Sequence, residues 1–162
     1  MTRRHLVARL GTVEAVPIGL ALRAPSEGDL EELAGIMLDA YRGTIDADGD
    51  ETPEVARDEV AGYFAGRSGA PHLEHSRVAI DRGRIVSAVL VSEFEGTPLI
   101  AYVFTAADHK GRGLADALTR AAMRALAGAG RERVHLWVTA GNTPAERIYE
   151  RLGFVDVADP AR

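Results

Sequence analysis

The sequence predicts an α/β domain with a mixed sheet, on three observations. Apolar residues repeat at helical spacing in several segments, short β-branched runs alternate with turn residues in the middle of the chain, and a strand, a helix and a strand follow one another towards the end. The last pattern indicates a parallel crossover inside an otherwise antiparallel sheet. A length of 162 residues suits a single core, so we expect one domain over residues 1–162.

The chain begins with an extension, a short strand and two amphipathic helices. Residues 1–17 form an N-terminal extension that the pattern does not place, and Ile18–Arg23 is the first predicted strand. The segment Ser26–Asp29 marks the start of the first helix, and the second has Thr52 as its N-cap with Pro53 at its first position. The residues of the second helix expected to face inward are Ala56, Val60, Tyr63 and Phe64.

Three strands joined by tight turns follow from Arg77 onward. Val78–Asp81, Ile85–Phe94 and Leu99–Thr105 are rich in β-branched residues, and the turns are expected at Arg82-Gly83 and at Glu95 to Pro98. This order predicts an antiparallel meander.

The last elements are a helix, a strand and a helix. Apolar residues from Leu114 to Ala125 share one face of a helix, Val134–Val138 is the next strand, and Pro144–Leu152 is the closing helix. Only Val155–Arg162 remain, so the free edge of the sheet needs cover from the N-terminal extension or from a second subunit in a homodimer.

Composition excludes several classes of function. The formal net charge of −5 argues against a nucleic-acid partner, which would need clustered Lys and Arg. No cysteine is present, which excludes disulfides, zinc thiolate sites and thiol catalysis and fits a reducing compartment. The apolar start of the chain is interrupted by Arg9, Gly11 and Glu14, so we expect neither a signal peptide nor a membrane partner, and a cytoplasmic location.

The most informative segment is Lys110–Ala115, which lies between a strand and an amphipathic helix. Gly111 and Gly113 let the chain turn sharply, so that several N–H groups face one point where the helix dipole adds roughly half a positive charge. A P-loop or a dinucleotide fingerprint does not fit the spacing of these glycines. On the residues alone, a glycine turn without a ligand stays an equal alternative to an anion site.

This segment resembles motif A of the GNAT (Gcn5-related N-acetyltransferase) superfamily, Arg/Gln-x-x-Gly-x-Gly/Ala, with Lys110 in place of the usual Arg or Gln. Taken with the strand before the last helix, the segment Trp137–Phe154 resembles motif B of the same family. The two lie in the expected order, and the resemblance covers about residues 20–157. The matched residues are Lys110, Gly111, Arg112, Gly113, Leu114 and Ala115 in motif A, and Asn142, Ala145, Tyr149, Glu150, Leu152, Gly153 and Phe154 in motif B.

The resemblance implies a fold and a co-substrate. The fold is a mixed, mostly antiparallel sheet of about six strands flanked by about four helices, with a β-α-β crossover carrying the coenzyme A loop. The co-substrate is acetyl-coenzyme A, and no metal is expected. Main-chain N–H groups of the loop would bind the pyrophosphate, and the strand before it would pair with the pantetheine arm. The implied contacts are Phe104, Thr105, Lys110, Gly111, Arg112, Gly113, Leu114, Ala115, Asn142 and Tyr149.

Two side chains near motif B have expected roles. Thr143 and Glu146 should form a capping box, which leaves Asn142 to bind the pantetheine arm or position a water. The resemblance makes Tyr149 the general acid, because the leaving thiolate of coenzyme A needs a proton. Its position on the apolar face of a helix also suits a core tyrosine.

The two motifs do not supply the general base, because Leu99–Thr105 contains no carboxylate where many family members have a glutamate. Glu93 is the first alternative, with Glu95 beside it and His135 as a weaker one. For each of them a solvated surface position is the competing interpretation. The oxyanion would be bound by a backbone N–H near Phe104 or Thr105.

The expected function is N-acetyl transfer from acetyl-coenzyme A to a primary amine of a small molecule or a protein or peptide, by direct attack in a ternary complex. The segment Gly43–Glu51, with Asp46, Asp48 and Asp50, would attract a cationic acceptor. The alternative is a non-catalytic acyl-coenzyme A binding or regulatory module with the same fold.

Overall fold

The computed structural model describes residues 2–42 and 51–157. The strands of the described part are β1 (Arg3–Arg9), β2 (Ala21–Arg23), β3 (Ala70–Pro71), β4 (Arg77–Asp81), β5 (Arg84–Phe94), β6 (Thr97–Thr105), β7 (Arg133–Thr139) and β8 (Val155–Asp156). The α-helices are α1 (Leu30–Tyr41), α2 (Pro53–Phe64), α3 (Leu114–Gly128) and α4 (Thr143–Arg151). Short 3-10 turns are η1 (Glu27–Asp29), η2 (Leu73–His75) and η3 (Ala107–His109).

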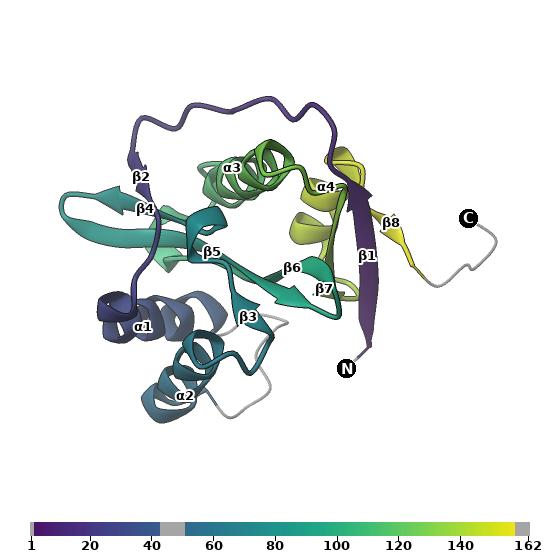
Figure 1. Ribbon diagram of the computed structural model, residues 1–162. Coiled ribbons are helices and arrows are strands. Elements are labelled where there is room, and N and C mark those ends of the chain that lie inside the picture. Colours follow the sequence, from purple (N-terminus) through teal and green to yellow (C-terminus); the bar gives the residue numbers. More distant parts are fainter. Residues whose placement is uncertain (1, 43–50, 158–162) are drawn as a thin grey trace.

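The described strands form one eight-stranded sheet in the order β2-β4-β5-β6-β7-β1-β8, with β3 paired to β5. Helices α1 and α2 cover one face, and α3 and α4 cover the other (Figure 1). Only the β6–β7 pair is parallel among the described strands, so the predicted α/β fold with a mostly antiparallel sheet and one β-α-β crossover is confirmed. The sheet exceeds the expected six or so strands because β3 and β8 have two residues each, too few for a sequence pattern to reveal.

The N-terminal extension is part of the sheet. Strand β1 pairs antiparallel with β7 along its whole length, from Arg3 opposite Thr139 to Arg9 opposite Arg133, and β8 pairs with its outer edge. The chain then crosses over α3 to reach β2 (Figure 1), where Arg124 donates a hydrogen bond to the carbonyl of Val13 at 2.6 Å. The extension therefore supplies the cover that the edge of β7 needs, one of the two expected solutions.

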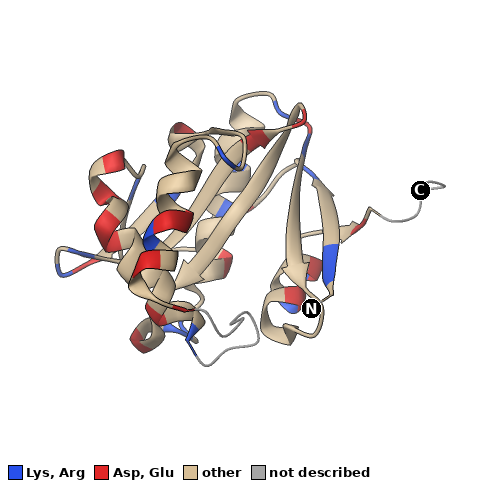
Figure 2. Ribbon diagram, turned by 90° about the horizontal axis from the view of Figure 1, so that it is seen from below, with Lys and Arg blue, Asp and Glu red and all other residues tan. Residues whose placement is uncertain are grey.

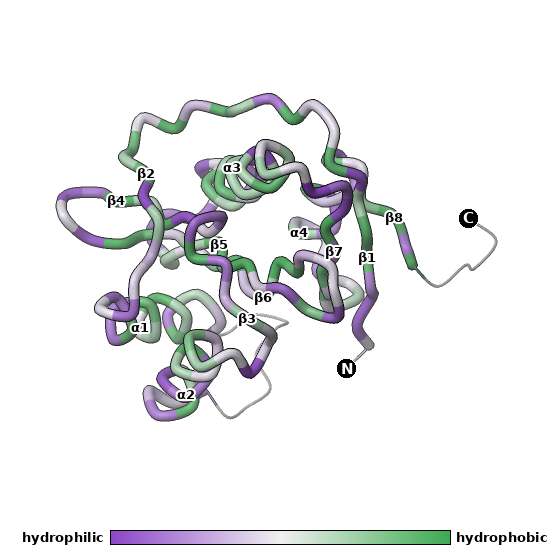
Figure 3. The backbone as a smooth tube through the Cα atoms, viewed as in Figure 1, coloured by the Kyte–Doolittle hydropathy of each residue, from purple (hydrophilic) through white to green (hydrophobic). Residues whose placement is uncertain are grey.

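Each face of the sheet has its own apolar cluster, and hydrophobic segments follow the strands between them (Figure 3). Leu118, Met123 and Leu126 of α3 pack with Leu136 of β7 on one face. On the other face the cluster includes Leu33, Met37, Val60, Tyr63 and Phe104.

Local turn chemistry follows the sequence closely. Arg82 and Gly83 have φ values of 53° and 77° and join β4 to β5, as predicted. Glu95 and Gly96, with φ values of 53° and 82°, make an equally short turn, so β6 begins at Thr97 rather than at Leu99. The first predicted strand, Ile18–Arg23, shortens to β2, because only its last three residues pair with β4.

The helix starts agree with the sequence at α2 and differ at α4. Thr52 Oγ1 accepts a hydrogen bond from the N–H of Val55 at 3.1 Å, which confirms the predicted N-cap. The predicted capping box of Thr143 and Glu146 is wrong, because α4 already begins at Thr143. Glu146 instead accepts from the N–H of Gly141 at 2.8 Å and forms an ion pair with Arg4 of β1.

Tyr63 provides a testable contribution to stability. Its side chain is fully buried, its hydroxyl donates to the carbonyl of Val91 at 2.6 Å, and it lies 3.1 Å from Ser76 Oγ. Burial raises the pKa of Tyr63 to about 12 from its ordinary value of 10.0. The raised pKa means that this stabilisation is complete below pH 10 and is lost as pH rises towards 12.

We expect Tyr63→Phe to lower the free energy of unfolding by about 0.5–1.5 kcal/mol at pH 7, because a buried hydrogen bond is lost while the Val91 carbonyl keeps its other donor, the N–H of His72. Urea denaturation measured between pH 7 and pH 12 checks this. The variant should lose less stability than the wild type on going to alkaline pH. Equal stability of the two proteins at pH 7 would contradict the role of this hydroxyl.

Candidate active site

The site begins where β6 and β7 separate. Within the described residues the two strands pair only at Leu99 with His135 and at Ile100 with Leu136. A register shift in the β5–β6 ladder leaves Ala101 without an opposite residue, which makes it a β-bulge. Bulges bend a strand, so β6 turns away from β7 beyond this point and the two strands open towards their carboxyl ends.

The register of β6 decides which main-chain groups face the opening. The N–H of Ala106 donates to the carbonyl of Val86 at 2.8 Å, so alternation along an antiparallel ladder turns the main-chain groups of Phe104 and Tyr102 towards β5. Those of Val103 and Thr105 then point to the β7 side. Of the two residues expected to pair with pantetheine, Thr105 has main-chain groups directed into the opening and Phe104 does not.

The side chains of these two residues are held inside the protein. The ring of Phe104 is buried and packs edge-to-face on Tyr41 with ring centroids 6.4 Å apart. Thr105 Oγ1 lies 2.9 Å from Ser87 Oγ. Any contact that they make with a ligand in the opening is therefore a main-chain contact.

A cavity of about 420 Å³ lies at the opening. It is bordered by β6 and β7, by α1 and α2 on one side and by α4 on the other. Its lining residues are Arg3, Met37, Leu38, Tyr41, Glu51, Thr52, Val55, Ala56, Glu59, Ile100, Ala101, Tyr102, Val103, Leu136, Trp137, Val138, Thr139, Asn142, Ala145 and Tyr149.

Tyr149 and Asn142 both line this cavity, as their expected roles require. Tyr149 is 8% exposed, and its ring packs edge-to-face on Phe154 with centroids 5.6 Å apart. Tyr149 is thus a core tyrosine by its packing and a cavity residue by its position, so the two interpretations of it do not exclude each other.

A carboxylate that the sequence analysis missed also lines the cavity. Glu59 projects from α2, and its Oε2 accepts a hydrogen bond from the hydroxyl of Tyr102 on β6 at 2.5 Å. Burial, and then the bond to Glu59, raise the pKa of Tyr102 well above its ordinary range, so its phenol stays protonated and donates. One signal was available, because Glu59 stands three residues after Ala56 and four before Tyr63, beside the apolar stripe of the helix.

The bases expected from the sequence lie elsewhere. Arg131 donates to both carboxylate oxygens of Glu93, at 2.7 and 2.6 Å, and this ion pair lowers the pKa of Glu93. His135 is buried with its Nδ1 2.8 Å from His5 Nε2, and burial lowers its pKa. Neither of them, nor Glu95, is among the described residues that line the cavity.

The predicted anion loop follows β6 at the open end of the strand pair, after η3. Gly111 and Gly113 have φ values of +79° and +78°, a conformation that disfavours residues with a side chain, and a Cβ at either position would point into open space. Gly113 directly precedes the first turn of α3. The loop itself does not line the cavity, whose lining residues on β6 are Ile100–Val103, earlier in the strand.

The charged side chains of the loop have protein partners. Lys110 Nζ donates to the carbonyl of Ala40 at the end of α1 at 2.6 Å, and Arg112 donates to the carbonyl of Asp108 at 3.2 Å. Asp116, which would be an unfavourable neighbour for a pyrophosphate, forms an ion pair with Arg120 at 3.0 Å. Both cationic side chains of the loop thus make hydrogen bonds within the protein.

The segment predicted to attract an acceptor lies mostly outside the described residues, since Asp46, Asp48 and Asp50 fall within 43–50. Glu51 is described and lines the cavity. In the described part of the chain, no helix combines the length and apolar character needed to cross a bilayer.

The sequence of this protein matches a known family. Residues 35–154 match the acetyltransferase (GNAT) family. The chain belongs to this family, as its two motifs indicated.

Relatives match parts of the chain. A mycothiol acetyltransferase of Corynebacterium aurimucosum is 41% identical over 63 residues, which cover 37% of this chain and 21% of that protein. N-alpha-acetyltransferase 30 of Schizosaccharomyces pombe is 34% identical over 86 residues, which cover 50% of this chain and 57% of that protein. The chain thus spans a fifth to somewhat over half of the length of these relatives.

Solved structures share the fold. A GCN5-related N-acetyltransferase from Sphaerobacter thermophilus superimposes with a TM-score of 0.73 at 22% identity, over 95% of this chain and 48% of that one. The PaiA N-acetyltransferase from Thermoplasma acidophilum in complex with coenzyme A gives a TM-score of 0.64 at 13% identity, over 83% of this chain and 89% of that one.

Proposed function

We propose that this protein transfers an acetyl group from acetyl-coenzyme A to a primary amine of a small molecule, peptide or protein, by direct attack in a ternary complex. One observation carries the proposal: the opening between β6 and β7 holds a cavity with Tyr149 on its α4 side and the Glu59–Tyr102 pair on its α2 side. An acid and a base at one cavity suit the two proton transfers that aminolysis of a thioester needs.

Coenzyme A would enter along the open edge of β6. The pantetheine arm would pair with the main-chain groups of Thr105 and Val103, and Asn142 would contact it from the start of α4. The pyrophosphate would be bound by main-chain N–H groups of Lys110, Gly111, Arg112, Gly113, Leu114 and Ala115, where two glycines and a helix N-terminus lie together. In this arrangement the thioester would lie at the cavity.

In the reaction the amine nitrogen forms a bond to the carbonyl carbon, and the bond from that carbon to sulfur breaks. Glu59 accepts the proton that the ammonium group must lose, since an amine with a pKa near 10 arrives protonated. Tyr149 donates a proton to the departing sulfur. The oxyanion is bound by a main-chain N–H of β6 on the open side, which favours Thr105 or Val103 over Phe104.

A cationic acceptor fits the charges of the cavity. Glu51 and Glu59 line it together with a single described cation, Arg3, and the aromatic residues Tyr41 and Trp137, of a kind that can bind an ammonium group, line it too. Acidic residues also recur along the helices (Figure 2), among them Glu54 and Asp58 of α2. The relatives are named a mycothiol acetyltransferase and an N-alpha-acetyltransferase, and these names are compatible with either a small-molecule or a peptide acceptor.

The test is a panel of primary amines and peptides assayed for release of free thiol from acetyl-coenzyme A. We expect turnover with at least one cationic amine, and initial-rate lines that intersect when both substrates are varied, as a ternary complex requires. Coenzyme A binding without turnover across the panel would favour the alternative, a non-catalytic acyl-coenzyme A module.

The loop gives a separate prediction for binding. Gly113→Ala places a side chain at φ +78°, which costs about 1–2 kcal/mol for a left-handed residue. The free loop can relieve this strain by leaving the left-handed conformation that the anion site requires, so we expect the Kd for acetyl-coenzyme A, measured by calorimetry, to rise about tenfold. The matched control is Gly128→Ala at the other end of α3, where a Cβ also meets open space but φ is ordinary. An unchanged Kd for Gly113→Ala would argue against the loop as the anion site.

A further inference from the structure

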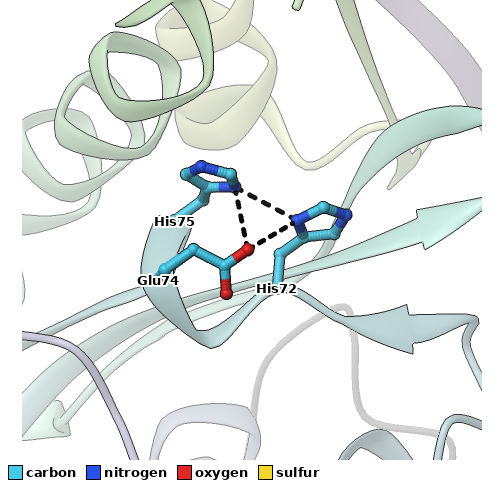
Figure 4. Close-up of side chains that lie close together, drawn as sticks. All are labelled: His72, Glu74 and His75. Carbon is cyan, nitrogen blue, oxygen red and sulfur yellow. Dashed lines mark hydrogen bonds and ion pairs between the residues drawn. The ribbon is translucent and has the colours of Figure 1, made fainter. Parts of the chain in front are cut away.

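A cluster of metal-ligating side chains lies outside the cavity, at the turn η2 between β3 and β4 (Figure 4). His72 Nδ1 lies 3.1 Å from His75 Nδ1 and 3.2 Å from Glu74 Oε1, and the remaining pair, His75 Nδ1 and Glu74 Oε1, is 3.7 Å apart. Figure 4 shows the three side chains converging from a single turn of backbone.

The contact of the second ring nitrogen of His72, Nε2, determines which nitrogen has a lone pair. Its Nε2 lies 2.7 Å from Glu93 Oε1, and because an ionised carboxylate only accepts, this nitrogen must donate its hydrogen. In a neutral imidazole Nδ1 is then an acceptor. In that state its lone pair faces the carboxylate of Glu74 at 3.2 Å. This arrangement favours a cation shared between the two groups, either a proton or a metal ion.

We propose that His72 Nδ1, Glu74 Oε1 and His75 Nδ1 bind a divalent transition-metal ion, with Zn²⁺ the best fit. Tetrahedral Zn²⁺ with bonds of 2.0–2.1 Å holds its ligand atoms about 3.3 Å apart, close to the three separations here. Two imidazoles and one carboxylate are a common donor set for zinc, and the fourth position is open to water because Glu74 is 67% exposed.

A second layer of contacts supports the first ligand. Glu93 of β5 orients His72 in the manner of the carboxylate–histidine–zinc arrangement, and Arg131, after α3, holds Glu93 with two hydrogen bonds. Orienting His72 would give Glu93 a role, although it does not line the cavity. The guanidinium of Arg77 also lies close, donating to the carbonyls of Glu74 and Ser76, and its charge will moderate the affinity.

The site would act on stability rather than on acetyl transfer. Ser76, the next residue after His75, has its Oγ bonded to the carbonyl of His72 at 2.8 Å and lies 3.1 Å from the hydroxyl of Tyr63 on α2. An ion at the turn would therefore fasten η2 to β5 and α2. The inference does not depend on the proposed function, because none of the three ligands lines the cavity.

The experiment is a titration of chelator-treated, metal-free protein with Zn²⁺ by calorimetry, and with Co²⁺ by its ligand-field absorption. We expect one ion per chain and a higher Tm with Zn²⁺. Glu74→Gln and His75→Gln should each weaken binding by more than about tenfold, and Glu93→Gln by about 10- to 100-fold. Glu74 is exposed, so its variant tests the site without disturbing the core.

The matched control is His109→Gln. His109 also has two carboxylate partners, but Asp108 lies at Nδ1 and Asp81 at Nε2, so the oxygens sit on opposite sides of the ring and cannot share an ion with it. Its Zn²⁺ affinity should equal that of the wild type. Absence of stoichiometric binding, wild-type affinity in Glu74→Gln and His75→Gln, or an equal loss in His109→Gln would each overturn the proposal.

Discussion

Replacing Glu59 with glutamine is expected to lower kcat/KM for a primary amine by about 10²- to 10⁴-fold at neutral pH. Glutamine keeps the size of the side chain and can still accept the hydrogen bond that Tyr102 donates, but it cannot take a proton from the ammonium group. The loss should shrink as pH rises towards the pKa of the acceptor, because the amine then arrives already neutral. Initial rates of thiol release between pH 6.5 and pH 10 measure both effects.

The matched control is Asp58→Asn, which removes the neighbouring charge from the same helix. Asp58 is 68% exposed, pairs with Arg67 at 3.0 Å, and is not among the described residues that line the cavity. We expect its kcat/KM to stay within about twofold of the wild type, since screened surface charges have small effects. If Glu59→Gln behaved like Asp58→Asn at neutral pH, Glu59 would not be the base.

Replacing Tyr149 with phenylalanine is expected to lower kcat by about 10²- to 10³-fold and to leave the Kd of acetyl-coenzyme A nearly unchanged. The hydroxyl is lost from a ring that is 8% exposed, and the ring's packing against Phe154 is retained, so the fold should persist. The measurements are steady-state kcat with the best amine of the panel and calorimetric binding of acetyl-coenzyme A.

Tyr63→Phe serves as the control for this change, because it removes a buried phenol that does not line the cavity. Assayed where it is folded, it should keep its kcat. Wild-type kcat in Tyr149→Phe would leave Tyr149 with its packing role alone and would assign the proton to another donor.

The parts of the fold that the sequence predicts are those decided by neighbouring residues. Arg82-Gly83 forms the hairpin turn between the two strands on either side of it. Thr52 caps α2 by accepting a hydrogen bond from the N–H of Val55, three residues later. Runs rich in β-branched residues likewise indicated β5, β6 and β7, and apolar residues at helical spacing indicated α3. In these places local propensity and the final structure agree.

The parts that escaped prediction depend on contacts distant in sequence. Strand β1 is held in the sheet by pairing with β7. The local sequence of Arg3–Arg9 does not indicate which strand it pairs with. Glu146 would suit a capping box, but Arg4, 142 residues away, provides a charged partner that the local sequence does not contain.

The candidate base escaped for the same reason. Glu59 and Tyr102 are 43 residues apart, and only the fold of α2 over β6 brings them together. Glu93 looked suitable because it ends the strand before the site, yet its carboxylate is held by Arg131. Glu93 was the expected base because it is close to β6 in the sequence. Glu59 is the better candidate because it lines the cavity.

A crystal structure with bound coenzyme A is the most direct test of the central claim, that the open edge of β6 and the cavity beside it form an acetyl-transfer site. We expect the pyrophosphate on the main-chain N–H groups of Lys110–Ala115, the pantetheine arm along Val103 and Thr105, and the sulfur in the cavity near Tyr149. Coenzyme A bound on another face, or with its sulfur outside the cavity, would contradict the account.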